Sequence, residues 1–258
     1  MLVRAEHDRS VLAGLLGKDP QLHAYELGDL DEFFWPYTSW FRRGDAVALL
    51  YHGARPPTLV ALAGPEGLAE VAALLGEVAP VLPARLWAHL SPGLDAALAG
   101  VFRVASAGVH LKMALTRADR LAAVEAAGEV LGRAHLPALR ELYEVAYPGN
   151  WFDARMVDTG RYVGVWAGGG LVAVAGVHVY SPTYRVAALG NVTTHPAWRG
   201  RGLAAAAVAR LCGLLRSEVE HVTLNVKADN VAAVRLYERL GFLRVADYEE
   251  FDLSAVGG

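Results

Sequence analysis

Cysteine is almost absent from this chain, and its histidines are scattered. The single cysteine, Cys212, excludes an intramolecular disulfide and any zinc site built from a cysteine cluster. Cys212 lies in an apolar helical pattern with no neighbour to activate it, so we expect a buried, inert thiol. The nine histidines form no His-x-x-x-His pair on an expected helix, so no metal site is predicted.

A strong charge of either sign and a long apolar run are also missing. The net charge of −3 gives no basic field that would favour nucleic acid or a membrane surface. No apolar run is long enough to span a membrane, and the first twenty residues are too charged for a signal peptide. We therefore expect a cytoplasmic protein with neither a nucleic-acid nor a membrane partner.

What is present is enough apolar material for a large core. The chain has 258 residues, of which 54% are hydrophobic and 20% are charged. That composition is typical of a folded globular protein, and the length allows one large domain or two modest ones.

The most informative stretch is Asn191 to Leu215, NVTTHPAWRGRGLAAAAVARLCGLL. An extended segment breaks at Pro196, two glycines follow at Gly200 and Gly202, and an alanine-rich helix begins. A helix start has unpaired N–H groups, and glycines let an anion approach them. The pattern predicts a pyrophosphate cradle or, equally well, a plain tight turn; it is neither a P-loop nor Gly-x-Gly-x-x-Gly.

Two motifs resemble those of the GNAT acyltransferase superfamily. Arg199, Gly202 and Ala204 match its Arg-x-x-Gly-x-Ala signature for acetyl-CoA, and 230–242 (NVAAVRLYERLGF) match Asn-x-x-Ala-x-x-Leu-Tyr-x-x-x-Gly-Phe. The resemblance covers roughly residues 128–253, and the glycine-N-acyltransferase-like branch is the most similar. It implies an α+β fold, a mixed twisted sheet flanked by helices.

Residues 121–258 are expected to form the catalytic GNAT domain. The pattern predicts a helix over 136–146, a hairpin of strands 162–166 and 171–180, and a strand over 185–194 that feeds the glycine turn. A strand over 221–226, a helix ending at Gly241 and one or two closing strands over 242–253 complete it.

Residues 1–120 resemble the reduced GNAT-like half of tandem members of the superfamily. They contain no Arg-x-x-Gly-x-Gly/Ala, so we expect no CoA binding there. One segment, 25–40, combines acidic residues such as Glu26 with aromatics. The first interpretation is a cluster of aromatic side chains packed between the domains, with the acidic residues in solvent. The second is a substrate-binding surface that holds an amine through charge and cation–π contacts.

By resemblance, the cofactor-binding residues are Val192, Thr193, Thr194, Arg199, Gly200, Arg201, Gly202, Leu203, Ala204 and Asn230. Backbone groups of Val192 and Thr194 would bind the pantetheine arm. Asn230 is equally explained as a helix N-cap. Substrate-binding candidates are Glu26 and Asn191, and Asp153 is a further residue that could orient substrate or water.

Tyr237 matches the family tyrosine that protonates the leaving thiolate. The family often has a glutamate base on the strand before the cradle, but residues 185–194 contain no carboxylate. His178, on the preceding strand, is the substitute candidate, because a neutral imidazole accepts a proton near pH 7; a structural histidine is the alternative.

The leading hypothesis is an N-acetyltransferase that moves an acetyl group from acetyl-CoA, without a metal, to a primary amine of a small molecule or amino acid. A non-catalytic acyl-CoA sensor and a nucleotide-binding module are the alternatives, and release of free thiol over an amine panel distinguishes the enzyme from both. A homodimer is compatible with the sequence, which does not specify the oligomeric state.

Overall fold

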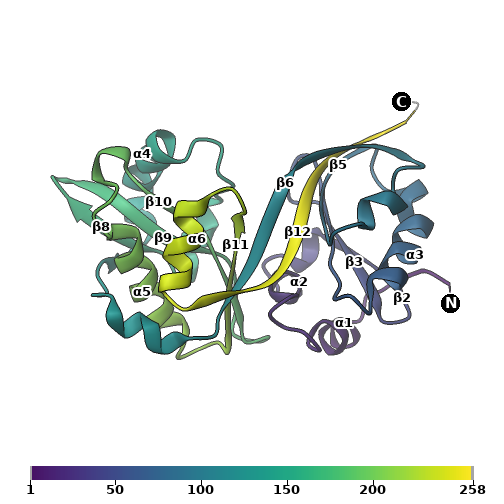
Figure 1. Ribbon diagram of the computed structural model, residues 1–258, viewed down its shortest axis with the longest axis horizontal. Helices are drawn as coiled ribbons and strands as arrows, with labels where there is room; N and C mark the ends of the chain where they lie inside the picture. The colour runs from purple at the N-terminus through teal and green to yellow at the C-terminus, as the bar shows by residue number, and fades with distance from the viewer. Residues whose placement is uncertain (1, 257–258) are drawn as a thin grey trace. The chain divides into compact units, whose positions relative to one another are not determined.

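The structure is a computed structural model that describes residues 2–256. The chain forms two compact units, and Figure 1 labels most of their helices and strands. The first unit comprises the residues up to Lys112 together with Val226–Asn230 and the residues from Arg244 onward. The second comprises Met113–Asn225 and Val231–Leu243.

This division differs from the expected boundary between residues 120 and 121. The C-terminal strand β12 (Phe242–Ala255) pairs with β5 (Arg85–Leu90) of the first unit, from Glu249 opposite Leu90 to Ser254 opposite Arg85. The first unit is therefore completed by the end of the chain, which a division by sequence position assigns to the second half.

In the first unit the strands follow the order β1-β2-β3-β4-β5-β12-β6. The β4–β5 pair is parallel, whereas β1–β2, β2–β3, β3–β4 and β5–β12 are antiparallel. The remaining elements are β1 (Arg4–Ala5), α1 (Arg9–Leu16), α2 (Ala24–Asp29), β2 (Thr38–Arg43), β3 (Ala46–Tyr51), β4 (Thr58–Ala61), α3 (Leu68–Val78) and β6 (Phe102–Leu115), with 3₁₀ helices at Trp35–Tyr37, Ala79–Val81 and Leu94–Ala97.

The core of the first unit lies against α3. Leu74 and Leu75 of this helix are fully buried and share a hydrophobic cluster with Leu59 of β4 and Leu86 of β5. At about 25 cal/mol for each Å² of apolar surface removed from water, such side chains supply most of the unit's stability.

In the second unit the strands follow the order β11-β10-β9-β8-β7. The β10–β11 pair is parallel, whereas β9 pairs antiparallel with both β10 and β8. The elements are β7 (Glu129–Val130), α4 (Leu136–Ala146), β8 (Val163–Ala167), β9 (Gly170–Ser181), β10 (Val186–Thr194), α5 (Leu203–Leu215), β11 (His221–Lys227) and α6 (Val231–Arg239), with 3₁₀ helices at Ala118–Ala123, Arg133–His135, Ala154–Thr159 and Pro196–Trp198.

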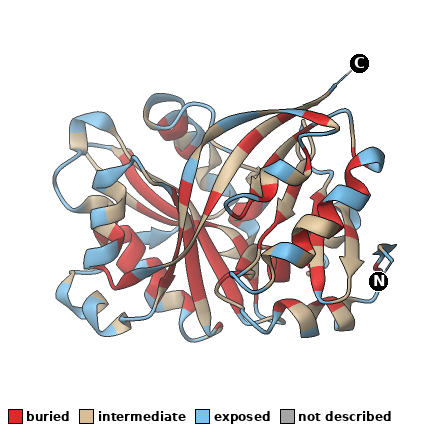
Figure 2. Ribbon diagram, turned by 45° about the vertical axis from the view of Figure 1, so that its right-hand side comes forward, coloured by how far each residue is buried: buried red, intermediate tan, exposed pale blue. Residues whose placement is uncertain are grey.

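Helix α5 supplies much of the second unit's core. Val208, Leu211, Cys212 and Leu215 recur on one face and are fully buried, and Figure 2 shows the buried residues in red along this helix and the strands. Burial raises the pKa of the Cys212 thiol from 9.0 to about 12. The expectation of a buried cysteine is confirmed.

The predicted hairpin, the helix after the glycines and the strand that feeds them are confirmed as β8–β9, α5 and β10. The sequence pattern missed β2, because its residues overlap the aromatic segment 25–40. The end of the chain forms one long strand, β12. No helix among the described residues is long and apolar enough to cross a bilayer.

Candidate active site

Strand β10 carries an irregularity at Asn191. This residue has φ +55°, and the pairing with β9 shifts between Gly190 and Thr193. A non-glycine residue in the left-handed region is uncommon and needs support from its surroundings. The Tyr143 hydroxyl supplies part of it by donating to the Asn191 carbonyl oxygen at 3.0 Å.

The two parallel strands β10 and β11 part beside this irregularity. Their pairing runs from Val186 opposite His221 to Leu189 opposite Leu224, although β10 continues to Thr194. Beyond Leu189 the described part of β11 no longer pairs with β10, and Val192, Thr193 and Thr194 lie in that part of the strand. All three are only partly buried.

The glycine turn after β10 has the backbone geometry of an anion cradle. Gly200 and Gly202 both have φ +77°, a region that L side chains avoid, and a methyl group added to either would meet no atom within 4 Å. Gly202 is the N-cap of α5, and its carbonyl accepts a hydrogen bond from the Ala206 N–H. The N–H groups of Leu203 and Ala204 stand in the first turn, where an anion is favoured.

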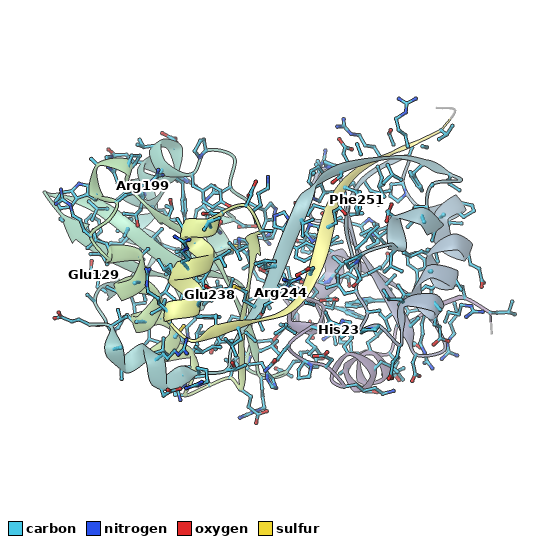
Figure 3. The ribbon with its side chains drawn as sticks, viewed as in Figure 1. His23, Glu129, Arg199, Glu238, Arg244 and Phe251 are labelled. Atoms are coloured by element: carbon cyan, nitrogen blue, oxygen red, sulfur yellow. The ribbon has the colours of Figure 1, made fainter. Side chains whose placement is uncertain are left out.

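Two arginines beside the turn add positive charge. Arg199, labelled in Figure 3, donates through Nε to the Thr194 carbonyl at 3.3 Å, and the Arg201 guanidinium lies 4.5 Å from the centre of the Trp198 ring. Both arginines are exposed, and neither has an acidic partner within the described part of the chain. Their charge therefore remains available to a phosphate.

His178 lies on β9, and its ring packs against Gly190 of β10. Gly190 makes room for it, because a methyl group at Gly190 would lie 2.3 Å from the imidazole. Burial lowers the pKa of His178, and a hydrogen bond with Asn191 opposes that shift. The ring is therefore neutral at pH 7, and Trp151 packs edge-on against it with 5.7 Å between centroids.

Asn191 links His178 to further polar groups. Its side-chain amide donates to the Trp151 carbonyl and to the Tyr162 hydroxyl, both at 3.1 Å, and the Asn150 amide donates to its side-chain oxygen at 3.4 Å. Asn191 is only 4% exposed, so these bonds replace water. The structure thus brings together two predicted site residues, His178 and Asn191.

Tyr237 lies on α6 and is 8% exposed, with its ring 5.8 Å from that of Phe242. Burial raises the pKa of its phenol well above 10.0, and the nearby phenol of Tyr147 raises it further. A phenol in this environment keeps its proton at neutral pH and can donate it. Gly241 ends α6 with φ +95°, and a methyl group there would lie 2.0 Å from the Arg117 carbonyl, which explains the Gly-Phe pair of the motif.

A cavity of about 430 Å³ opens beside these groups. Two of its lining residues, Tyr143 and Asn150, bond to Asn191, and a third, Tyr147, affects the pKa of Tyr237. The cavity therefore adjoins the irregularity in β10, and its Tyr147 lies close enough to Tyr237 to act on the pKa of that phenol. Its lining comprises Arg140, Tyr143, Glu144, Tyr147, Pro148, Gly149, Asn150 and Phe152.

Three other candidates have hydrogen-bond or ion-pair partners of their own. Glu26 belongs to the first unit, where it is 3% exposed and bonded to His23 at 3.0 Å. Asn230 precedes α6, and its N–H donates to the Lys227 carbonyl at 3.0 Å. Asp153 caps a 3₁₀ helix and pairs with Arg155, so its carboxylate is already neutralised.

Sequence analysis missed the residues that α4 contributes. Arg140, Tyr143, Glu144 and Tyr147 recur at spacings of three and four, which places them on one face of a helix. That spacing was visible in the sequence. What the sequence did not show is that this face lines a cavity, since the contact with Asn191 joins residues 48 positions apart.

Comparisons with known proteins identify the family. Residues 125–242 match the Acetyltransferase (GNAT) family. The N-alpha-acetyltransferase RimI of Mycobacterium tuberculosis is 34% identical over 137 residues, which cover 51% of this chain and 77% of that protein. The chain belongs to the GNAT family, and it is an N-acetyltransferase of that type.

Solved structures share the fold. A putative GNAT acetyltransferase from Novosphingobium aromaticivorans is 25% identical with a TM-score of 0.52, covering 76% of this chain and 84% of that one. A tandem GNAT protein from the clavulanic acid biosynthesis pathway is 20% identical with a TM-score of 0.53, covering 100% and 99%. In the described residues no cluster of metal-ligating side chains occurs.

Proposed function

We propose that this protein transfers an acetyl group from acetyl-CoA to the primary amine of a small molecule. The observation that carries the proposal is the position of one cavity against three features of the second unit: the parted β10 and β11, the irregularity at Asn191 and the buried phenol of Tyr237. An acyl transfer needs an anchored thioester, an amine, a polarised carbonyl and a proton for the thiolate.

The glycine turn would anchor the donor. The N–H groups at the start of α5 and the charges of Arg199 and Arg201 favour a pyrophosphate, and the left-handed glycines keep side chains out of its way. Backbone groups of Val192 and Thr194 would bind the pantetheine arm along β10. A β10 N–H would also polarise the acetyl carbonyl.

The reaction then requires one bond to form and one to break. The neutral amine attacks the thioester carbonyl, the C–N bond forms, and the C–S bond breaks as the tetrahedral intermediate collapses. Tyr237 donates its phenolic proton to the departing thiolate, so that free CoA leaves as the thiol. The Tyr237 phenol holds its proton at neutral pH, as a donor to the thiolate must. Burial makes it a weaker acid by raising its pKa, so the match of residues 230–242 to the family motif is what supports this role.

The proton released by the amine needs an acceptor, and His178 is the proposed one. Its neutral state at pH 7 and its hydrogen bond with Asn191, which contacts the cavity-lining Asn150, support this assignment. The phenol of Tyr237 is then restored by proton exchange with solvent.

Release of free thiol from acetyl-CoA over a panel of amines tests the proposal. We expect turnover by the wild type and a fall in kcat of about 100-fold or more in Tyr237→Phe, the range of general acid catalysis. Tyr180→Phe is the matched control, because Tyr180 lies in the same unit but bonds to Glu218.

Three outcomes would contradict the proposal. Tight CoA binding without turnover on any amine would assign the protein as an acyl-CoA sensor. Equal rates for Tyr237→Phe and Tyr180→Phe would remove Tyr237 from the chemistry. A larger thermal shift with ATP than with CoA would point instead to a nucleotide site at the glycine turn.

A further inference from the structure

One face of α4 presents two opposite charges to the cavity. Arg140, Tyr143, Glu144 and Tyr147 line it together, and the two charged residues are exposed. An arginine and a glutamate four residues apart on a helix are within reach of each other and often pair. Within residues 2–256 Arg140 and Glu144 do not pair with each other or with another charged side chain.

Three other arginines of this unit do have acidic partners. Arg133 pairs with Asp158, Arg161 with Glu218 and Arg185 with Glu220. Among the described residues, Arg140 and Glu144 are thus two unpaired charges of opposite sign on the cavity wall. A cavity with a separate cation and anion is complementary to a ligand that carries both charges.

Glu144 and Arg140 lie at different positions along α4 relative to the candidate acid Tyr237. Tyr147 is the member of this row that lies close enough to Tyr237 to act on the pKa of its phenol. With a rise of 1.5 Å per residue, Glu144 lies about 4.5 Å along the helix axis from Tyr147 and Arg140 about 10 Å. The anion of the wall is therefore nearer the candidate acid, and the cation is farther away.

We propose that the acceptor is a free amino acid, whose carboxylate binds Arg140 while its ammonium group is drawn in by Glu144. This inference rests on the proposed function and narrows its acceptor class. Arg140 can hold a carboxylate through two parallel hydrogen bonds. Glu144 attracts the ammonium form, which must lose its proton before it attacks the thioester.

The aromatic part of the wall fits such a ligand. Tyr147 and Phe152 offer apolar surface to a side chain, while the carboxylate and the amine take the polar positions. An amine that lacks the carboxylate leaves Arg140 without its partner. A peptide places its carboxylate beyond the α-carbon that carries the amine, so its fit to the same two charges is poorer.

The test compares an amino acid with its amide, for example alanine with alaninamide, by free-thiol release from acetyl-CoA. The wild type should favour the acid, and Arg140→Gln should reduce kcat/KM for alanine by about 10- to 100-fold while changing that for alaninamide less than about threefold. The ratio between variants cancels the different basicities of the two amines. Arg210→Gln, an exposed arginine on α5, should change neither.

Charge reversal gives a second, positive readout. Arg140→Glu should lose activity on alanine and gain activity on a diamine such as putrescine, because the distal ammonium of the diamine takes the place of the carboxylate. Glu144→Gln should raise KM for alanine, whereas Glu141→Gln, which is exposed on the same helix but does not line the cavity, should not.

The outcomes distinguish a failure of the amino-acid assignment from a failure of the proposed function. Suppose that amines are acetylated but Arg140→Gln lowers kcat/KM for alanine and alaninamide equally, or that a dipeptide is as good an acceptor as alanine. The amino-acid assignment is then wrong, while the proposed acetyltransferase activity stands. If no amine releases thiol from acetyl-CoA, the proposed function itself fails.

Discussion

At the scale of single residues, the candidate site depends on side chains that lose water and replace it with specific partners. Asn191 and Tyr162 are buried, and each bonds to groups around the irregularity in β10. Gly176 and Gly190 lie opposite each other on β9 and β10, and a methyl group on either would meet the ring of Tyr162 or His178 at 2.3 Å. The two glycines thus create the space in which this network forms.

The state of His178 leads to a pH prediction. Because burial lowers its pKa below 6.5, the base form persists in mildly acidic solution and is lost as the pH falls through that lowered value. The acid limb of the wild-type kcat/KM profile should therefore lie below pH 6.5. His178→Gln should lower the plateau about tenfold or more and remove that limb.

A second variant separates catalysis from packing. Gly190→Ala keeps the imidazole but displaces it, so it should lower activity while leaving an acid limb in place. If His178→Gln retains the wild-type limb, the proton acceptor is another group, and His178 only positions Asn191.

The residues of the site differ in how far the sequence predicted them. Tyr237 and the glycines were predicted because their motifs are local and regularly spaced. Glu26 shows the opposite case: it is 3% exposed and bonded to His23, and the Lys112 ammonium lies 4.8 Å from the neighbouring Tyr25 ring. The first unit thus supplies its own cation to this acidic and aromatic segment, a contact between residues far apart in sequence.

At the scale of elements, the candidate site lies where β10 and β11 separate and α5 begins. Local signals located both strands and the helix, since alternating apolar residues and paired glycines are short-range features. The separation could not be predicted, because it depends on the register between two strands that are far apart in the sequence.

The turn before α5 gives the prediction at this scale. Gly202→Val forces a β-branched residue to φ +77°, which costs about 1–2 kcal/mol and places a side chain in the cradle. Affinity for CoA, measured by calorimetry, should fall about tenfold or more.

Gly213→Ala is the matched control. Gly213 lies within α5, has no positive φ and has open space around its Cα. Alanine there should stabilise the helix by roughly 0.5–1 kcal/mol and leave CoA affinity unchanged. Wild-type affinity in Gly202→Val would show that the cradle is not where the pyrophosphate binds.

At the scale of the whole molecule, each unit has a parallel strand pair, but the two pairs end differently. In the second unit β10 and β11 part after Leu189. In the first unit the contact continues past Ala61 and Leu90, because the Ser91 hydroxyl bonds to both the N–H and the carbonyl of Ala63. This closure supports the proposal that the first unit binds no CoA, which the sequence suggested only through a missing motif.

The first unit should also give the molecule a pH-dependent stability. Burial lowers the pKa of His89 from 6.5 to about 4, although Glu250, whose Oε1 lies 3.5 Å from its Nε2, opposes the shift. Between those values the unfolded chain binds a proton that the folded chain does not, so stability falls as the pH falls from 6.5 to 4. The other groups that act on His89 are His110, Lys112 and Glu26.

The size of this effect can be measured by urea unfolding at several pH values. At about 1.36 kcal/mol per pKa unit, His89 contributes up to about 3 kcal/mol of the loss. His89→Gln should make the free energy of unfolding depend less on pH. The lowered pKa of His178 also destabilises the fold at acid pH, so the difference between this variant and the wild type gives the contribution of His89 alone. An unchanged slope would mean that His89 protonates in the folded chain.

Cys212 has a practical meaning for every experiment on turnover. The thiol is fully buried in α5 with a pKa of about 12, so in the native protein it does not react with the disulfide dyes that report free sulfhydryl groups. Any colour that develops with native enzyme then comes from released CoA, and colour from the protein itself measures the fraction that has unfolded.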